Sequence, residues 1–272
     1  MNYYLATAEL PRIEENPTWS YGDWLHARYI VKNGVGGHTE DPNLPWYTAE
    51  GLAAGQSSNY VWSTGDMSDE ATIDFWMQAP FHAVGILDPH LVQTGYSLYR
   101  EPGAAFQVAA ALDVIRGRGS VPPSVTFPIK WPSADMTVPL ASYGGNEYPN
   151  PLTGCPGYTP PAGLPIILRI GAGQLTPNVA SHSFLQGSTS LQHCLFDETS
   201  YTNPDSSQQA TARSVLNGRD AIVLIPRAPL GRLYRFHHGE RANSYLDLHG
   251  IEHRPGHRGG TRSNTRYCPR KI

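Results

Sequence analysis

The chain has 272 residues, of which 40% are hydrophobic and 16% charged, and this composition excludes a disordered protein. Its length suits one large domain or two modest ones. The formal net charge of −3 gives no reason to expect a polyanion as partner of the whole chain, and no apolar run is long enough for a transmembrane helix.

The first predicted elements are helices with recognisable beginnings. Ser20 can cap a helix over residues 21–33, and a shorter helix is expected to begin at Thr48. A third helix follows Ser68, whose hydroxyl can cap it, and Pro80 is expected to end it. The sequence therefore predicts three helices early in the chain.

Two strands are predicted next. Residues 92–99 and 105–115 flank the turn Glu101-Pro102-Gly103, a pattern typical of an antiparallel hairpin. Helices that precede a short antiparallel sheet, without regular alternation of strand and helix, indicate an α+β fold. We therefore expect residues 1–118 to form one compact α+β domain.

The rest of the chain changes in pattern twice. Residues 119–163 are rich in proline, which disfavours helix, and are expected to form a connector that packs along a domain surface. Residues 164–236 have an all-β pattern with short apolar runs between Gly, Asn, Ser and Pro. The clearest predicted strands are residues 164–170, 180–185, 191–196 and 221–226. This spacing is typical of a small immunoglobulin-like sandwich.

The C-terminal residues 237–272 form a basic tail. From Gly231 onward there are eight Arg, one Lys and five His. Such a tail can be disordered, can bind nucleic acid, or can result from a lost reading frame. We favour the last interpretation, because the tail begins where the sandwich still needs strands, and we expect the tail to be unpacked and the sandwich incomplete.

The three cysteines, Cys155, Cys194 and Cys268, include no C-x-x-C pair, so a zinc ribbon is not expected. Cys155 and Cys194 lie in the same β-rich region and are predicted to form a disulfide, which suits an oxidising compartment. The alternative is that both are unpaired buried thiols. The N-terminus shows no charged and apolar segments of an export signal, so we expect the natural start to lie upstream of Met1.

Several segments resemble the bacterial branch of the CAP superfamily (cysteine-rich secretory proteins, antigen 5 and pathogenesis-related-one proteins). They occur in the family's order across residues 1–118. They are His26-Ala27-Arg28-Tyr29, Gly37-His38-Thr39-Glu40-Asp41-Pro42, Tyr47-Thr48-Ala49-Glu50-Gly51, Ser57-Ser58-Asn59, Trp76-Met77-Gln78-Ala79-Pro80-Phe81-His82 and Gly85-Ile86-Leu87. A weaker likeness, Ile225-Pro226-Arg227-Ala228-Pro229-Leu230, is to immunoglobulin-like modules that follow bacterial CAP domains.

The resemblance implies an α-β-α sandwich with a cleft that holds two histidines and two acidic residues. His38 and His82 stand at the two histidine positions. The acidic positions do not match, because Ser57-Ser58-Asn59 stands where the family has Gly-Glu-Asn. Glu40 and Asp74 are the carboxylates that we expect to supply the cleft from other places.

Two interpretations of this cleft remain open. The neutral imidazoles of His38 and His82 could bind zinc, although two histidines make a weak site unless a carboxylate completes it. Alternatively, both histidines are hydrogen-bonded residues that hold loops together. His26 is expected to be a packing histidine, and His90, His182 and His193 have no partner at a useful spacing.

Two function hypotheses follow. The first is an extracellular, non-enzymatic binding module for a lipid, a wall component or a partner protein. The second is a metal-dependent, peptidase-like hydrolase that uses the His38/His82 cleft. The sequence has no glycine-rich phosphate loop and no Gly-x-Ser-x-Gly motif, so neither nucleotide chemistry nor a serine hydrolase is expected. Nucleic acid is not an expected partner either.

Overall fold

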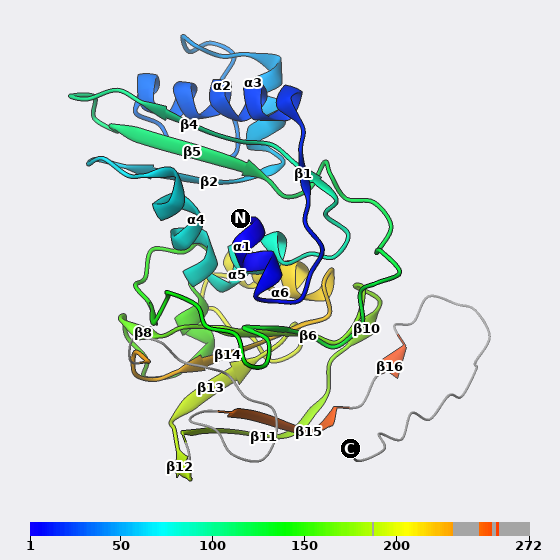
Figure 1. Cartoon of the computed structure of the whole chain (residues 1–272). Helices are drawn as coiled ribbons and strands as arrows, with labels where there is room; N and C mark the ends of the chain where they lie inside the picture. The colour runs from blue at the N-terminus through cyan, green and yellow to red at the C-terminus, as the bar shows by residue number, and fades with distance from the viewer. Residues whose placement is uncertain (187, 231–244, 252–253, 256–272) are drawn as a thin grey trace.

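A computed structural model of the chain describes residues 1–186, 188–230, 245–251 and 254–255, and the fold is α+β (Figure 1). The described helices are α1 (Asn2–Ala6), α2 (Pro17–Asn33), α3 (Ala49–Gly55), α4 (Asp69–Gln78), α5 (Pro80–Ile86), α6 (Ser206–Asn217) and the 3-10 helix η1 (Pro151–Gly154). Among them, none combines the length and the hydropathy that crossing a membrane would require.

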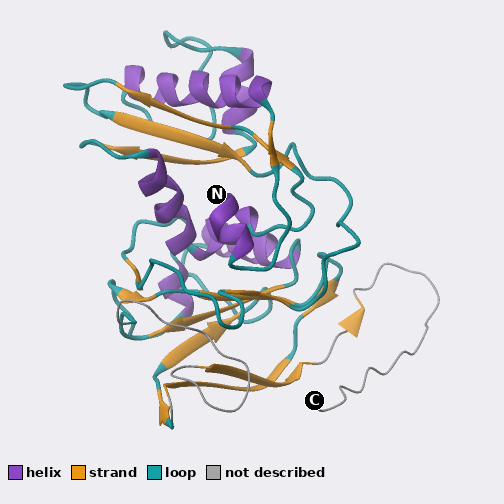
Figure 2. Ribbon diagram, in the orientation of Figure 1, coloured by secondary structure: helices purple, strands orange, loops and turns teal. Residues whose placement is uncertain are grey.

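The strands form several small sheets (Figure 2). The first sheet has the order β2 (Ser58–Ser63), β5 (Val108–Asp113), β4 (Tyr96–Arg100), and the second sheet has the order β13 (His193–Phe196), β14 (Ala221–Pro226), β9 (Ile166–Arg169), β6 (Ile129–Trp131). The remaining strands before the C-terminal tail are β1 (Glu14–Glu15), β3 (Gln93–Thr94), β7 (Ser142–Tyr143), β8 (Ala162–Gly163), β10 (Leu175–Thr176), β11 (Val179–Gln186) and β12 (Thr189–Ser190).

Helices cover both faces of the first sheet (Figure 1). Side chains of a strand point alternately to opposite faces, so neighbours on β5 pack against different helices. Ala109 packs with Ile30 of α2, whereas Ala110 and Leu112 belong to the cluster that contains Trp76 of α4. The first sheet therefore lies in the middle of three layers, with α2 and α3 on one side and α1, α4 and α5 on the other.

The local signals for this part were largely correct. Thr48 and Ser68 accept hydrogen bonds at the starts of α3 and α4, as predicted, and β4 pairs with β5 as the predicted hairpin. The start of α2 differs from the prediction. Asn16, not Ser20, caps it, because the Asn16 side chain accepts the N–H groups of Thr18 and Trp19 and Pro17 stands at the first helical position.

One apolar core continues from the first sheet to the second through a shared layer of helices (Figure 1). The buried cluster includes residues of α1, α4, α5, α6 and β14. Examples are Tyr4, Trp76, Val84, Leu216 and Val223. Helix α6 was not predicted, and the all-β pattern expected over residues 164–236 is wrong for this helix. Asp205 caps it by accepting the N–H groups of Ser207 and Gln208, a signal that the short apolar runs obscured.

The proline-rich segment, residues 119–163, is part of the second sheet and of the buried core as well as a connector. It contributes β6 to the second sheet, and Trp131 of this strand is completely buried, with its indole N–H donated to the Thr7 hydroxyl at 3.1 Å. Tyr143 and Cys155 are buried as well. The predicted disulfide between Cys155 and Cys194 is confirmed, and it fastens this segment to β13.

Part of the C-terminal tail is paired. Strand β15 (Tyr245–Ile251) is antiparallel to β11, and β16 (Arg254–Pro255) pairs with β10. For these residues the structure differs from the expected unpacked tail, because β11 offers a strand edge for pairing. The rest of the tail, with Cys268, lies outside the described residues, so the expectations of disorder and a lost frame remain predictions.

Candidate functional site

A cavity of about 660 Å³ opens beside the first sheet, between β2, α4, α5 and the proline-rich segment. Both histidines predicted from the sequence line it, although they are far apart in the chain. Its main lining residues are His38, Tyr60, Trp62, Phe75, His82 and Tyr148. The cavity therefore combines two imidazoles with an aromatic wall.

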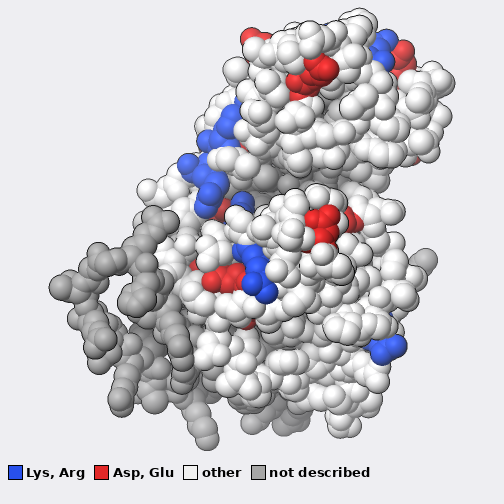
Figure 3. All heavy atoms as spheres, turned by 180° about the vertical axis from the view of Figure 1, so that it is seen from behind, with Lys and Arg blue, Asp and Glu red and all other residues white. Residues whose placement is uncertain are grey.

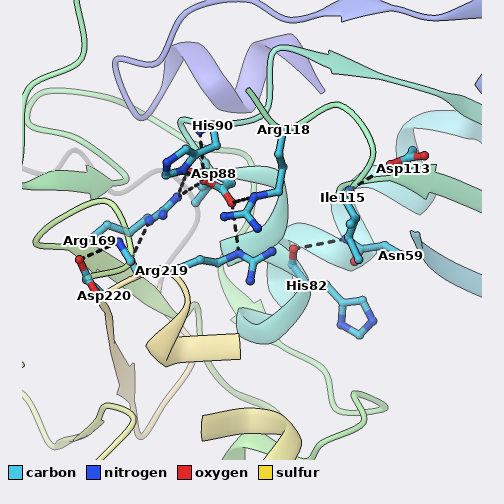
Figure 4. Close-up of polar contacts among 12 residues, drawn as sticks. Asn59, His82, Asp88, His90, Asp113, Ile115, Arg118, Arg169, Arg219 and Asp220 are labelled. Carbon is cyan, nitrogen blue, oxygen red and sulfur yellow. Dashed lines mark hydrogen bonds and ion pairs between the residues drawn. The ribbon is translucent and has the colours of Figure 1, made fainter. Parts of the chain in front are cut away.

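His82 lies in the first turn of α5 and is held by Glu147. The distance from His82 Nδ1 to Glu147 Oε1 is 2.8 Å, and the His82 backbone N–H donates to the same oxygen at 3.0 Å. An ionised carboxylate oxygen can only accept, so in this arrangement Nδ1–H donates its hydrogen bond to Oε1 and Nε2 of the neutral imidazole keeps its lone pair. Asn59 donates to the His82 carbonyl at 3.3 Å, and the imidazole points away from the neighbouring cluster of arginines (Figure 4).

Glu147 is the residue that sequence reasoning missed. Its side chain has no exposed surface, and burial raises its pKa, while the hydrogen bond from His82 opposes that rise. Its second oxygen, Oε2, has no hydrogen-bond partner among the described residues. A signal was present, because Glu147 is the only acidic residue in the 61 positions from Met136 to Phe196.

His38 also lines the cavity, and in the described part of the chain its ring is hydrogen-bonded to a backbone carbonyl and to no carboxylate. Its Nδ1 lies 2.9 Å from the carbonyl oxygen of Gly55, which can only accept, so the proton is on Nδ1 and Nε2 is free. The ring meets Tyr60 edge to face at 4.7 Å between centroids. Burial lowers the pKa of His38, and the nearby His82 lowers it further. His38 therefore presents a neutral imidazole.

Glu40, expected in the cleft, lies elsewhere. Its Oε1 is 3.0 Å from His26 Nδ1, and its Oε2 accepts the backbone N–H of Thr48 at 3.1 Å. Both side chains of this pair have no exposed surface. His26 Nε2 faces the carbonyl of Gly37 at 3.0 Å, so both of its nitrogens are occupied and the prediction of a packing histidine is confirmed. Glu40 fixes the loop that carries His38 to the start of α3.

Asp74, the other expected carboxylate, faces a different cavity of about 500 Å³. It accepts the Tyr4 hydroxyl at 2.5 Å, because its side of α4 packs against α1. Ser58, which stands where the family has glutamate, donates its hydroxyl to buried Asp23 at 2.7 Å and does not line the site. Among the residues that the structure describes, Glu147 is thus the carboxylate bonded to a cleft histidine.

The side chains of the cleft supply only some of the ligands that a divalent metal needs. Each cleft histidine has Nδ1 held by an oxygen acceptor and Nε2 free, which is the orientation of metal-binding histidines. However, no group of three or more His, Cys, Asp or Glu side chains that could hold a metal occurs within the described ranges. Glu147 uses Oε1 to hold His82, so the cleft offers two imidazole ligands and a supporting carboxylate.

Three other histidines that sequence spacing left without partners do make contacts. His182 Nδ1 and His193 Nε2 lie 2.7 Å apart on neighbouring parts of β11 and β13, and His193 Nδ1 lies 2.8 Å from the Leu191 carbonyl. His90 Nδ1 lies 3.0 Å from Asp88. These contacts occur away from the cavity lined by His38 and His82.

Comparison of the chain with protein-family models, with curated proteins and with solved structures found no match.

Proposed function

We propose that this chain is an extracellular CAP-like binding module whose cleft, lined by His38 and His82, holds a lipid-type ligand without catalysis. The three-layer arrangement around the first sheet supports the CAP-like part of the proposal, as does the position of both histidines on one cavity. The disulfide between Cys155 and Cys194 supports an oxidising, extracellular location. An immunoglobulin-like origin of the second sheet remains part of the proposal, with α6 as a departure from that pattern.

The observation that carries the binding role is the composition of the cavity wall. Aromatic and apolar side chains provide most of it, and Trp62 and Tyr148 remain 42% and 64% exposed. Trp62 is held in place by stacking on Phe106 at 3.9 Å between ring centroids. Large exposed aromatic surfaces beside a few polar groups are typical of ligand sites.

A lipid suits this wall better than the other two ligand classes. Tyr60, Trp62 and Phe75 can bury an apolar chain. The free Nε2 atoms of the histidines can accept a hydrogen bond from a head group that donates one, such as a hydroxyl group or the carboxyl group of a fatty acid, whose protonated form is favoured by burial in an apolar cavity. A wall glycan would use the same aromatic side chains but would need more polar partners, and a partner protein would need a larger surface.

The test is a titration of the protein with palmitate, read by tryptophan fluorescence and by calorimetry. We expect saturable binding that Trp62→Ala weakens roughly tenfold, because a buried aromatic contact contributes on the order of 1.5 kcal/mol or more. Trp46→Ala is the matched control, since Trp46 is 45% exposed but does not line the cavity.

Equal palmitate affinity in Trp62→Ala and Trp46→Ala would refute the proposed ligand site. A titration of the same proteins with a soluble muropeptide separates the wall-component hypothesis. Tight muropeptide binding that depends on Trp62, with no palmitate binding, would replace the lipid by a wall ligand at the same cavity.

The second candidate is the metal-dependent hydrolase, favoured by the free Nε2 atoms of His38 and His82. Zinc bound there would supply Lewis-acid activation of water, and the chain's part would be two imidazole ligands and Glu147 to orient His82. The two imidazoles fall short of the three protein ligands that a catalytic zinc usually has. Calorimetric zinc titration should show weak binding that is lost in His82→Ala and falls below about pH 6.5, since protonated imidazole cannot coordinate. A flat titration would remove this candidate.

A further inference from the structure

Charged side chains are sparse on this protein, yet three arginines converge on one carboxylate. Figure 3 shows a largely uncharged face on which Lys and Arg side chains form a few small groups, some of them near its narrow middle with Asp and Glu side chains beside them. Asp88 follows α5, and its Oδ1 lies 3.1 Å from Nη1 of Arg169 and its Oδ2 lies 3.0 Å from Nε of Arg118. The Nε of Arg219 approaches Oδ2 at 3.6 Å. We call Asp88, Arg118, Arg169 and Arg219 the arginine cluster (Figure 4).

The charges of the arginine cluster do not balance. A second carboxylate, Asp220, acts electrostatically on Arg169, and its two oxygens accept the backbone N–H groups of residues 173–175. When Asp220 is counted, three guanidinium groups face two carboxylates, so within the described residues one positive charge of the cluster has no counterion. The side chains of Arg169 and Arg219 are only 0% and 13% exposed, so water screens this charge poorly.

Two nitrogen atoms of the cluster are also without hydrogen-bond partners. Nη2 of Arg169 and Nε of Arg219 are buried, and neither donates to any acceptor among the described residues. A buried guanidinium that leaves a donor unused costs free energy. Burial lowers the pKa of Arg219, Asp88 opposes that change, and Arg118 lowers the pKa further, so the two guanidinium groups are close enough to repel each other.

We propose that the arginine cluster binds a small free oxyanion, such as phosphate or sulfate, between Arg118 and Arg219. Both guanidinium groups lie on the same side of Asp88, in contact with its Oδ2 (Figure 4). Planar guanidinium groups bind oxyanions through paired N–H donors, and one bound anion would supply the missing negative charge. Arg118, with 36% of its side chain exposed, provides the entry from solvent.

The position of this site gives the anion a structural consequence. Asp88 and Arg118 belong to segments that follow α5 and β5, whereas Arg169 lies on β9 and Arg219 follows α6. Arg169 also donates to the carbonyls of Leu87 and Arg219. An anion held by Arg118 and Arg219 therefore links the part of the chain around the first sheet to the second sheet, and its binding should stabilise the fold.

The test uses inorganic phosphate and sulfate as probes, with chloride at equal ionic strength as the reference. We expect a saturable rise in the melting temperature of the wild-type protein and a heat of binding by calorimetry. Arg118→Gln should weaken phosphate binding roughly tenfold or more, because it removes charge-assisted hydrogen bonds. Arg118→Lys should bind phosphate with intermediate affinity, because it keeps the positive charge but loses the planar guanidinium group with its paired N–H donors.

Arg100→Gln is the matched control. Arg100 is 41% exposed and pairs through Nε with Asp66 at 3.1 Å, much as Arg118 pairs with Asp88, but within the described ranges no other arginine forms an ion pair with Asp66. This variant should respond to phosphate as the wild type does. The proposal is overturned if the wild-type protein shows no saturable response to phosphate or sulfate, or if Arg118→Gln and Arg100→Gln respond equally.

Discussion

Two histidine–carboxylate pairs lie close to the cleft, and they differ in what they leave available. In the pair of His26 and Glu40 both side chains are fully buried and both imidazole nitrogens face oxygen atoms. In the pair of His82 and Glu147 the carboxylate is equally buried, but the imidazole is 16% exposed, lines the cavity and has only its Nδ1 bonded to the carboxylate. The same two residue types therefore form a closed structural pair in one place and an open one in the other.

The difference shows how to recognise a functional histidine from its surroundings. Hydrogen bonding to a carboxylate does not distinguish the two pairs, since both have it. The number of nitrogen atoms left for a ligand does distinguish them: none for His26 and one each for His82 and His38. We therefore assign stability to the pair of His26 and Glu40, and ligand binding to His82 with His38.

The largest effect is expected from Glu40→Ala. This change leaves His26 Nδ1 and the Thr48 backbone N–H without their acceptor inside the protein, so the free energy of unfolding should fall by about 3 kcal/mol or more. Denaturant unfolding measures it. Glu50→Ala in the exposed first turn of α3 is the control and should change stability by less than about 1 kcal/mol.

A smaller loss of stability is expected from Glu147→Ala, about 1–3 kcal/mol, because burial already makes the Glu147 carboxylate costly. Its effect on the cleft should be clearer, since His82 is no longer held and palmitate binding should weaken. Glu147→Gln keeps an oxygen acceptor for both N–H groups of His82, so it should retain both stability and binding. If Glu147→Ala destabilised the fold as much as Glu40→Ala without changing binding, the distinction between the two pairs would fail.

The smallest effect concerns pH and His38. Its pKa is lowered in the folded protein, mainly by burial, so the unfolded chain binds more protons below about pH 6.5. The free energy of unfolding should therefore decrease as the pH falls below that value. His38→Asn, whose amide N–H can still donate to the Gly55 carbonyl, should flatten this part of the profile. Parallel profiles for the two proteins would show that His38 does not titrate as proposed.

Local signals were enough to predict much of the chain around the first sheet. Caps such as Thr48 and Ser68, and the hairpin of β4 and β5, depend on residues a few positions apart. The two cleft histidines were likewise found from short motifs. The carboxylate of the cleft could not be identified in this way. The two expected candidates lie elsewhere, because Glu40 is held by His26 and Asp74 by Tyr4, and these contacts form only when the helices pack.

The charged residues of the proline-rich segment and of the strands after it have partners that local sequence patterns could not identify. From Met136 to Phe196 the only charged side chains are Glu147 and Arg169, and both are buried. Each pairs with a residue far earlier in the chain, His82 for Glu147 and Asp88 for Arg169. An isolated charge in a long uncharged stretch was thus a signal for a long-range pair, but spacing alone could not identify the partner.

The most direct test of the central claim, that the cavity lined by His38 and His82 is the ligand site, is chemical-shift mapping by NMR during a palmitate titration. The account predicts that the largest changes occur at His38, His82 and the segment from Tyr60 to Ser63, while His26 is unaffected. Changes confined to the cavity beside Asp74, or a response of His26 equal to that of His82, would contradict it.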